Sequence, residues 1–217
     1  TSTTLVSGAL TLMLRSSFIR FLLFTGLLMA APAALAARTI LVFGDSLSAG
    51  YGIPQDAAWP SLLTKRLQVR KLDYSVVNAS ISGETTSGGR ARLKEALEKH
   101  SPVIVVIALG SNDGLRGLPV ATMRENLLAM TDAAQQRKAR VLIVGQRLPP
   151  NYGPYANQFH QVFGEIAKAR KTAFVDFLLD GIALTPVLFQ PDNLHPTAEA
   201  QPRILENVWR GLEPLLK

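Results

Sequence analysis

The run Val103–Leu109 is apolar at every position, and it limits the folds open to this 217-residue chain. A strand with one solvated face alternates apolar and polar residues, whereas a strand covered on both faces is apolar throughout. Shorter, mainly apolar runs occur at Thr39–Phe43 and Val141–Val144. Strands buried on both faces belong to parallel sheets covered by helices. The pattern therefore predicts an α/β protein with residues 103–109 as its central strand.

Stretches with helical periodicity separate these runs. Apolar residues that recur at three- and four-residue intervals indicate amphipathic helices. We expect helices at 59–69, 89–99, 120–137, 156–170 and 198–216, and further strands at 74–77 and 173–175. Alternating strands and helices, joined by right-handed crossovers, predict a three-layer α/β/α sandwich with a mainly parallel five-stranded sheet. The loops after the strands then meet at one edge of the sheet.

The N-terminal 36 residues stand apart from this alternation. Met13 is followed by Arg15, Arg20 and a long uncharged run that ends in Ala34-Leu35-Ala36. A short positive segment, an apolar stretch and a small-x-small ending are typical of a signal peptide. We expect residues 1–12 to be upstream or artificial sequence, 13–36 to be a signal peptide and 37–217 to be a single domain.

A retained membrane anchor is the alternative for this segment. The uncharged run between Arg20 and Arg38 contains Pro32 and falls short of the roughly 20 apolar residues that a spanning helix needs. Cleavage is the favoured interpretation, and it predicts a periplasmic or secreted protein.

Charge and composition exclude several classes of function. The net charge of +7 falls to +5 without Arg15 and Arg20, and the remaining basic residues lie beside acidic ones rather than on one basic face. Nucleic-acid binding requires such a face, so we expect no nucleic-acid partner, although transient contact with anionic lipid surfaces is compatible with the charge. Three histidines and no cysteine predict neither a metal site nor disulfides. We expect a monomer without a cofactor.

Gly44-Asp45-Ser46-Leu47 follows the first strand and offers a nucleophile. A serine hydroxyl is a weak nucleophile until a base accepts its proton. Gly44 allows a tight exit from the strand, and the Asp45 side chain can bond within the turn. Alone, the segment would equally suit a turn or a helix capped by Ser46. It is not the Gly-x-Ser-x-Gly elbow, because residue 48 is serine.

Asp192 and His195 offer the base and the group that orients it. Three residues apart on a proline-bounded turn, the carboxylate can bond Nδ1 of the imidazole and leave Nε2 free to accept a serine proton. A surface turn that caps the next helix is the simpler alternative. His100 ends a helix beside Pro102, and His160 lies inside a helix with no acid at matching spacing, so we expect no catalytic role for either.

Acyl transfer also needs donors for the developing oxyanion. Asn112 can offer its side-chain N–H, while Gly83 and Ser46 can offer backbone N–H groups. Both Asn112 and Gly83 would equally suit ordinary turns.

Together the four segments resemble those of the SGNH/GDSL hydrolase superfamily, named for its Ser, Gly, Asn and His blocks. Longer matches at 77–83, 110–117, 147–153 and 192–202 are similar to the group of bacterial periplasmic thioesterases I, lysophospholipases L1 and arylesterases. The resemblance implies a flavodoxin-like fold and an acyl-enzyme on Ser46, with His195 as general base and Asp192 as its orienter. It also implies an oxyanion hole of Ser46, Gly83 and Asn112. Family members cleave acyl-CoA thioesters, lysophospholipids and aryl or short-chain esters.

The resemblance further implies that the segment 113–118 is a mobile loop over the substrate, with two glycines as hinges. Loop residues at the same edge are candidates for an acyl groove, although they equally suit packing against the scaffold. These candidates are Leu115, Leu118, Pro149 and Tyr152.

Three other functions compete with an acyl ester and thioester hydrolase. A carbohydrate O-deacetylase would need a polar, open cleft, and Leu115 and Leu118 favour an apolar one. A non-catalytic acyl-chain binder would not need an intact nucleophile and base. A nucleotide-binding loop at Gly44–Gly52 lacks the Gly-x-Gly-x-x-Gly spacing.

Overall fold

The computed structural model describes residues 38–216, and these form one parallel five-stranded sheet with the strand order β2-β1-β3-β4-β5. The predictions for residues 1–12 and 13–36 lie outside the described residues. The strands are β1 (Arg38–Gly44), β2 (Tyr74–Asn78), β3 (Ile104–Ala108), β4 (Arg140–Val144) and β5 (Ala173–Val175). The predicted α/β class and the parallel sheet are confirmed, and β3 is its central strand, buried at every position.

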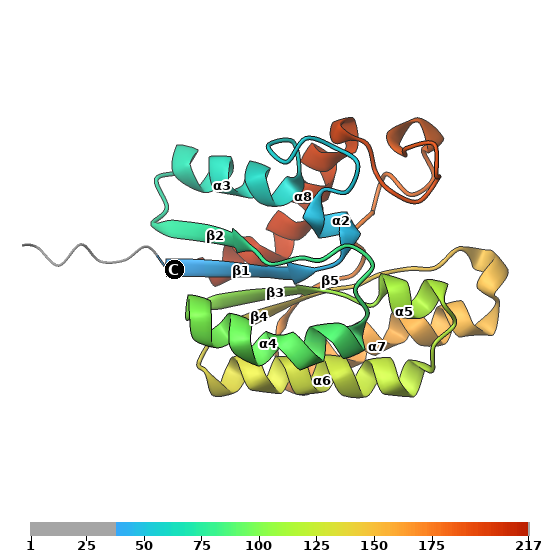
Figure 1. Cartoon of the computed structure of the whole chain (residues 1–217), viewed down its shortest axis with the longest axis horizontal. Coiled ribbons are helices and arrows are strands. Elements are labelled where there is room, and N and C mark those ends of the chain that lie inside the picture. Colours follow the sequence, from blue (N-terminus) through green and yellow to red (C-terminus); the bar gives the residue numbers. More distant parts are fainter. Residues whose placement is uncertain (1–37, 217) are drawn as a thin grey trace, which may run out of the picture. The chain divides into compact units, whose positions relative to one another are not determined.

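Helices cover both faces of the sheet, which makes the three layers visible in Figure 1. On one face lie α3 (Trp59–Val69) and α8 (Gln201–Leu212), and on the other lie α4 (Thr86–His100), α6 (Val120–Gln136) and α7 (Pro154–Arg170). None of the helices in the described part of the chain is long and apolar enough to cross a membrane.

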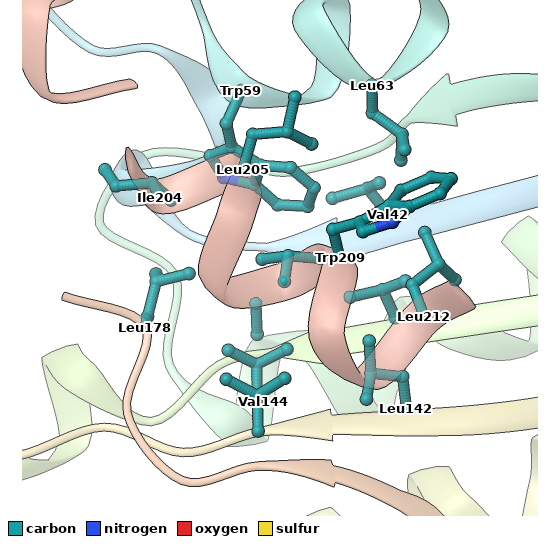
Figure 2. Packing of buried hydrophobic residues seen from close by; sticks show 14 of the residues in the cluster. Val42, Trp59, Leu63, Leu142, Val144, Leu178, Ile204, Leu205, Trp209 and Leu212 are labelled. Atoms are coloured by element: carbon teal, nitrogen blue, oxygen red, sulfur yellow. The ribbon is translucent and has the colours of Figure 1, made fainter. Parts of the chain in front are cut away.

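The layer under α3 and α8 is packed around two tryptophans (Figure 2). Trp59 of α3 is fully buried, and Trp209 of α8 is 5% exposed. Gly211 lets α8 approach the sheet, because a Cβ atom there would lie 2.7 Å from Leu142 Cδ1. Full burial of a large apolar side chain stabilises the fold by about 1.5–3 kcal/mol relative to leaving it exposed. The two helices are therefore fixed on the sheet whose edge carries the site.

Two short helices, which the periodicity did not predict, begin at motif residues. They are α2 (Ser46–Ala49) and α5 (Ser111–Leu115). Elements this short contain too few positions to show a helical period. A third difference is the start of α4, which begins at Thr86 rather than at residue 89, because the Thr85 side chain accepts a hydrogen bond from Gly88 N and caps the helix.

Candidate active site

Ser46 is the first residue of α2, at the carboxyl end of β1. Asp45 caps this helix, and its Oδ1 accepts a hydrogen bond from Leu47 N at 3.1 Å. Gly44 has no room for a side chain, since a Cβ atom there would lie 2.7 Å from Ser48 Oγ and 3.0 Å from the carbonyl oxygen of Ala108. The sharp exit from β1 thus depends on glycine and on an aspartate cap, and it presents Ser46 at the sheet edge.

His195 lies on a turn closed by an isolated bridge between Phe189 and Pro196. Its Nε2 is 2.9 Å from Ser46 Oγ, and its Nδ1 is 2.7 Å from Asp192 Oδ2. Asp192 Oδ1 in turn accepts hydrogen bonds from Leu194 N and His195 N, at 2.9 and 3.0 Å. The carboxylate therefore holds both the turn and the ring, as the three-residue spacing predicts.

Hydrogen bonds favour the ionised form of the Asp192 carboxyl, whose side chain is also 42% exposed to solvent. The His195 backbone N–H, the His195 ring and the Leu194 N–H lower the pKa of Asp192 from 3.8 to about 2. An ionised acceptor at Nδ1 favours the tautomer with hydrogen on Nδ1, so Nε2 faces Ser46 as an acceptor. The arrangement is thus suited to proton transfer from serine to histidine.

The pKa of Asp45, next to the nucleophile, is shifted in the opposite direction. Its side chain is fully buried, and burial raises its pKa from 3.8 to about 6, partly offset by the Leu47 N–H and the Ser111 hydroxyl. A carboxyl group without water around it disfavours its charged form. Asp45 and Asp192 therefore titrate in different pH ranges.

Three hydrogen-bond donors surround the cleft at Ser46. Gly83, with φ +78°, and Asn112, the second residue of α5, line the same cleft as Ser46 and His195, and its volume is about 260 Å³. The backbone N–H groups of Ser46 and Gly83 donate no hydrogen bond to any group within residues 38–216. Asn112 Nδ2 donates to the Glu84 carbonyl oxygen at 3.0 Å, which fixes the amide and leaves its second hydrogen.

Hydrogen bonds to a buried carboxylate, Asp113, connect the segments that carry Asn112 and Gly83. Asp113 is 3% exposed; its Oδ2 accepts from Thr86 N at 2.8 Å, and its Oδ1 accepts from Thr86 Oγ1 at 2.6 Å. Asn126 Nδ2 donates to the same hydroxyl at 3.2 Å. These bonds join the start of α5 to the start of α4, which follows Gly83. Sequence reasoning missed this network, because its members are far apart in the chain.

The cleft walls differ in part from the four predicted groove residues. Leu115 lines the cleft, while Leu118, Pro149 and Tyr152 do not. The Tyr152 hydroxyl instead donates to the Leu115 carbonyl oxygen at 3.2 Å, so it supports the wall from behind. The lining residues that the sequence did not indicate are Leu47, Tyr51, Ser82, Ser111 and Leu194. Tyr51 also packs on His195, with 4.4 Å between the ring centroids.

The structure shows the surroundings of two further residues, Gly114 and His160. Gly114, expected as a hinge, lies inside α5, and a Cβ atom there would lie 2.7 Å from Phe159 Cε2, so close packing also favours a glycine at this position. His160, for which we expect no catalytic role, has its Nε2 3.2 Å from Asp176 Oδ1. That acid follows β5 and is distant in sequence, so local spacing could not reveal it.

A fully hydrogen-bonded Ser–His–Asp set at the edge of a parallel sheet is the arrangement of serine hydrolases. Within the described residues, no group of three or more His, Asp or Glu side chains could hold a metal ion. The model of the GDSL-like Lipase/Acylhydrolase family matches residues 42–202, and the chain belongs to this family.

Comparison with known proteins agrees with this assignment. The chain is 50% identical to "Esterase TesA" of Pseudomonas aeruginosa over 182 residues, which covers 83% of this chain and 90% of the relative. It is 40% identical to "Thioesterase 1/protease 1/lysophospholipase L1" of Escherichia coli over 184 residues, covering 84% and 87% of the two chains. The crystal structure of TesA has 49% sequence identity and a TM-score of 0.81, and the match covers 82% of this chain and 100% of that one. The family resemblance and the predicted hydrolase class are confirmed.

Proposed function

We propose that the protein is a serine esterase and thioesterase that hydrolyses acyl esters through an acyl-enzyme on Ser46. The observation that carries the proposal is the unbroken hydrogen-bonded chain from Asp192 through His195 to Ser46, with contacts of 2.7 and 2.9 Å. Ser46 Oγ attacks the acyl carbon while His195 Nε2 takes its proton. The bond to the leaving alcohol or thiol then breaks, and the leaving group receives that proton.

Water completes the cycle by the same route. It attacks the acyl carbon and gives a proton to His195, and Ser46 leaves with the proton that His195 returns. In both halves the ionised Asp192 stabilises the imidazolium that forms. The oxyanion of each tetrahedral intermediate is bound by the backbone N–H groups of Ser46 and Gly83 and by the Asn112 amide. Each such donor commonly contributes about 10²–10³ in kcat.

The cleft suits an acyl chain. Its walls include Leu47, Tyr51, Leu115 and Leu194, and its volume is about 260 Å³. The relatives are named as an esterase and as a thioesterase and lysophospholipase. We therefore assign aryl and short-to-medium-chain esters, acyl-CoA thioesters and lysophospholipids as substrates. A carbohydrate deacetylase on this scaffold is less favoured, because the walls are mainly apolar.

We further propose that the protein is exported as a monomer to the periplasm or beyond, after cleavage following Ala36. The charged and apolar pattern of residues 13–36 supports this location, and transient contact with lipid surfaces would give access to lysophospholipids. N-terminal sequencing of the protein from a periplasmic extract tests the cleavage. A mature protein that still begins upstream of residue 20 would contradict it.

The activity is tested with a chain-length series of p-nitrophenyl esters and acyl-CoA thioesters. Turnover should vary with acyl length, and Ser46→Ala should lose it while keeping the unfolding temperature of the wild type. A phosphonate that labels serine hydrolases should modify the wild type and leave the variant unmodified. Retention of most of the rate by Ser46→Ala would refute the proposed nucleophile.

A further inference from the structure

Arg116 is an exposed cation at the rim of the cleft. It directly follows Leu115, which lines the cleft, and its Nη2 donates to the carbonyl oxygen of Gly83 at 3.0 Å. Gly83 is one of the three proposed oxyanion donors. The guanidinium group therefore contacts a residue that would bind the ester carbonyl.

The positive charge of Arg116 is not neutralised by its acidic neighbours. Among the ion pairs within residues 38–216, none includes Arg116. Glu84, the nearest acid to Gly83 in sequence, is paired with Arg92. Asp113 is buried and bonded to Thr86, and Asp192 is bonded to His195. A guanidinium has several donors, and the Gly83 carbonyl uses one of them.

The position of this charge matches a polar leaving group rather than an acyl chain. An acyl chain gains free energy by lying against the apolar walls, while a charged leaving group stays at the solvent-exposed rim. Guanidinium binds phosphate in a two-pronged geometry that few other side chains provide. An unpaired arginine at the rim is thus complementary to an anionic leaving group.

We propose that Arg116 determines specificity by binding a phosphate group carried by the leaving group. This inference rests on the proposed ester hydrolase function. A lysophospholipid carries its phosphate one glycerol unit from the ester, whereas acyl-CoA carries it beyond the whole pantetheine arm. Because Arg116 contacts Gly83 itself, the short glycerol spacer fits the separation better.

The test compares substrates that share one acyl chain and differ in phosphate. A monoacylglycerol and the corresponding lysophosphatidic acid differ only in the phosphate group, while an acyl-CoA carries its phosphates beyond the pantetheine arm and a p-nitrophenyl ester carries none. Each substrate is kept below the concentration at which it forms micelles and is assayed with the wild type, Arg116→Ala and Arg116→Lys. Arg137→Ala serves as a control, since Arg137 is an exposed arginine at the far end of α6, paired with Glu98.

Arg116→Ala should lower kcat/KM for lysophosphatidic acid by roughly 10- to 100-fold, the usual range for a hydrogen-bonded charged contact. It should leave the monoacylglycerol and the p-nitrophenyl ester within about twofold, with Arg116→Lys in between. A parallel loss on acyl-CoA would mean that its phosphates reach the same cation, and a loss on acyl-CoA alone would assign the site to CoA.

Two outcomes would overturn the inference. Equal losses on all four substrates would mean that Arg116 acts by holding the Gly83 carbonyl, and no loss on any would mean that it has no role. In both cases continued turnover of the p-nitrophenyl ester by the wild type would leave the proposed hydrolase function intact. Absence of turnover on every substrate by the wild type would instead refute the function itself.

Discussion

Gln190 donates from its side-chain Nε2 to the carbonyl oxygen of Tyr51 at 2.8 Å, which joins the turn carrying His195 to the loop that follows Ser46. The same nitrogen is 3.1 Å from the Pro196 carbonyl oxygen, and Gln190 N donates to the His195 carbonyl oxygen at 2.8 Å. One residue thus closes the histidine turn and attaches it to the nucleophile segment. We expect the 2.9 Å distance from His195 Nε2 to Ser46 Oγ to depend on this link.

Replacing Gln190 by Glu should therefore lower kcat with little change in KM. Glutamate has the same shape but cannot donate to the Tyr51 carbonyl oxygen, and the small misplacement of His195 that follows should cost roughly 10- to 100-fold in kcat. Steady-state kinetics on one p-nitrophenyl ester measure the effect, with Gln68→Glu on the exposed face of α3 as the matched control. An effect confined to KM would place Gln190 in substrate binding instead.

Asp192 should make the stability of the protein sensitive to strongly acidic pH. Its pKa is lowered to about 2 in the folded protein from 3.8, so its contribution is present above pH 4 and is lost as the pH falls through about 2. Asp192→Asn should therefore unfold at a lower temperature than the wild type near neutral pH, and this difference should shrink between about pH 4 and pH 2. Its kcat should fall by roughly 10²–10⁴ because the imidazole loses its ionised partner.

Thermal unfolding of both proteins across this pH range measures the first effect. A difference in unfolding temperature that stays constant from neutral to acidic pH would show that the Asp192 carboxylate is not coupled to folding. Activity that survives in Asp192→Asn at near wild-type kcat would show that the turn alone orients His195.

Asp45 should have the opposite effect on stability. Burial raises its folded pKa to about 6, so the folded state retains a proton that the unfolded state releases, and stability falls as the pH rises from about 4 to 6. Asparagine in place of Asp45 keeps an oxygen for the Leu47 N–H but does not titrate. Asp45→Asn should therefore gain stability relative to the wild type by on the order of 2–3 kcal/mol between about pH 4 and pH 7.

Urea unfolding at about pH 4 and at about pH 7 measures the free energy of unfolding of the wild type and the variant. Asp132→Asn provides a control. Asp132 is a partly exposed surface carboxyl paired with Arg170, and this pairing lowers the pKa of Asp132 rather than raising it. If the stability of Asp45→Asn and wild type changed in parallel with pH, the Asp45 carboxyl would have to be ionised in the folded protein throughout.

The sequence predicts those parts of the molecule that depend on local pattern. The strand at 103–109 is recognisable because burial on both faces requires apolar side chains at every position. Ser46, Gly83 and Asn112 are recognisable because each follows a strand at the same sheet edge. Asp192 and His195 are recognisable because three residues suffice to close their contact.

Contacts between distant segments leave no such pattern. Three contacts each join segments that are distant in the sequence and that the fold brings together: the donation from Gln190 to Tyr51, the Asp113–Thr86 bonds and the His160–Asp176 contact. The helix α5 escaped prediction for a related reason. Its five residues include Gly114, a poor helix former, and the buried Asp113 contacts to Thr86 tie it to α4.

Asn112 should contribute to the transition state rather than to substrate binding. Its amide is held by the Glu84 carbonyl oxygen at 3.0 Å, and the residue lines the cleft, so we expect the second hydrogen to be available before substrate arrives. The charge on the acyl oxygen develops only as Ser46 attacks, and the hydrogen bond strengthens at that moment. Asn112→Ala should accordingly lower kcat by roughly 10²–10³ and change KM by less than about threefold.

Steady-state kinetics on a p-nitrophenyl ester, with Asn157→Ala on the exposed surface of α7 as control, separate the two parameters. Asn112→Asp sharpens the test, because a carboxylate keeps the shape of the side chain but repels the oxyanion instead of donating to it. It should be at least as inactive as the alanine variant. A rise in KM at unchanged kcat in both variants would move Asn112 from transition-state stabilisation to ground-state binding, and the oxyanion would then depend on the Ser46 and Gly83 backbone N–H groups alone.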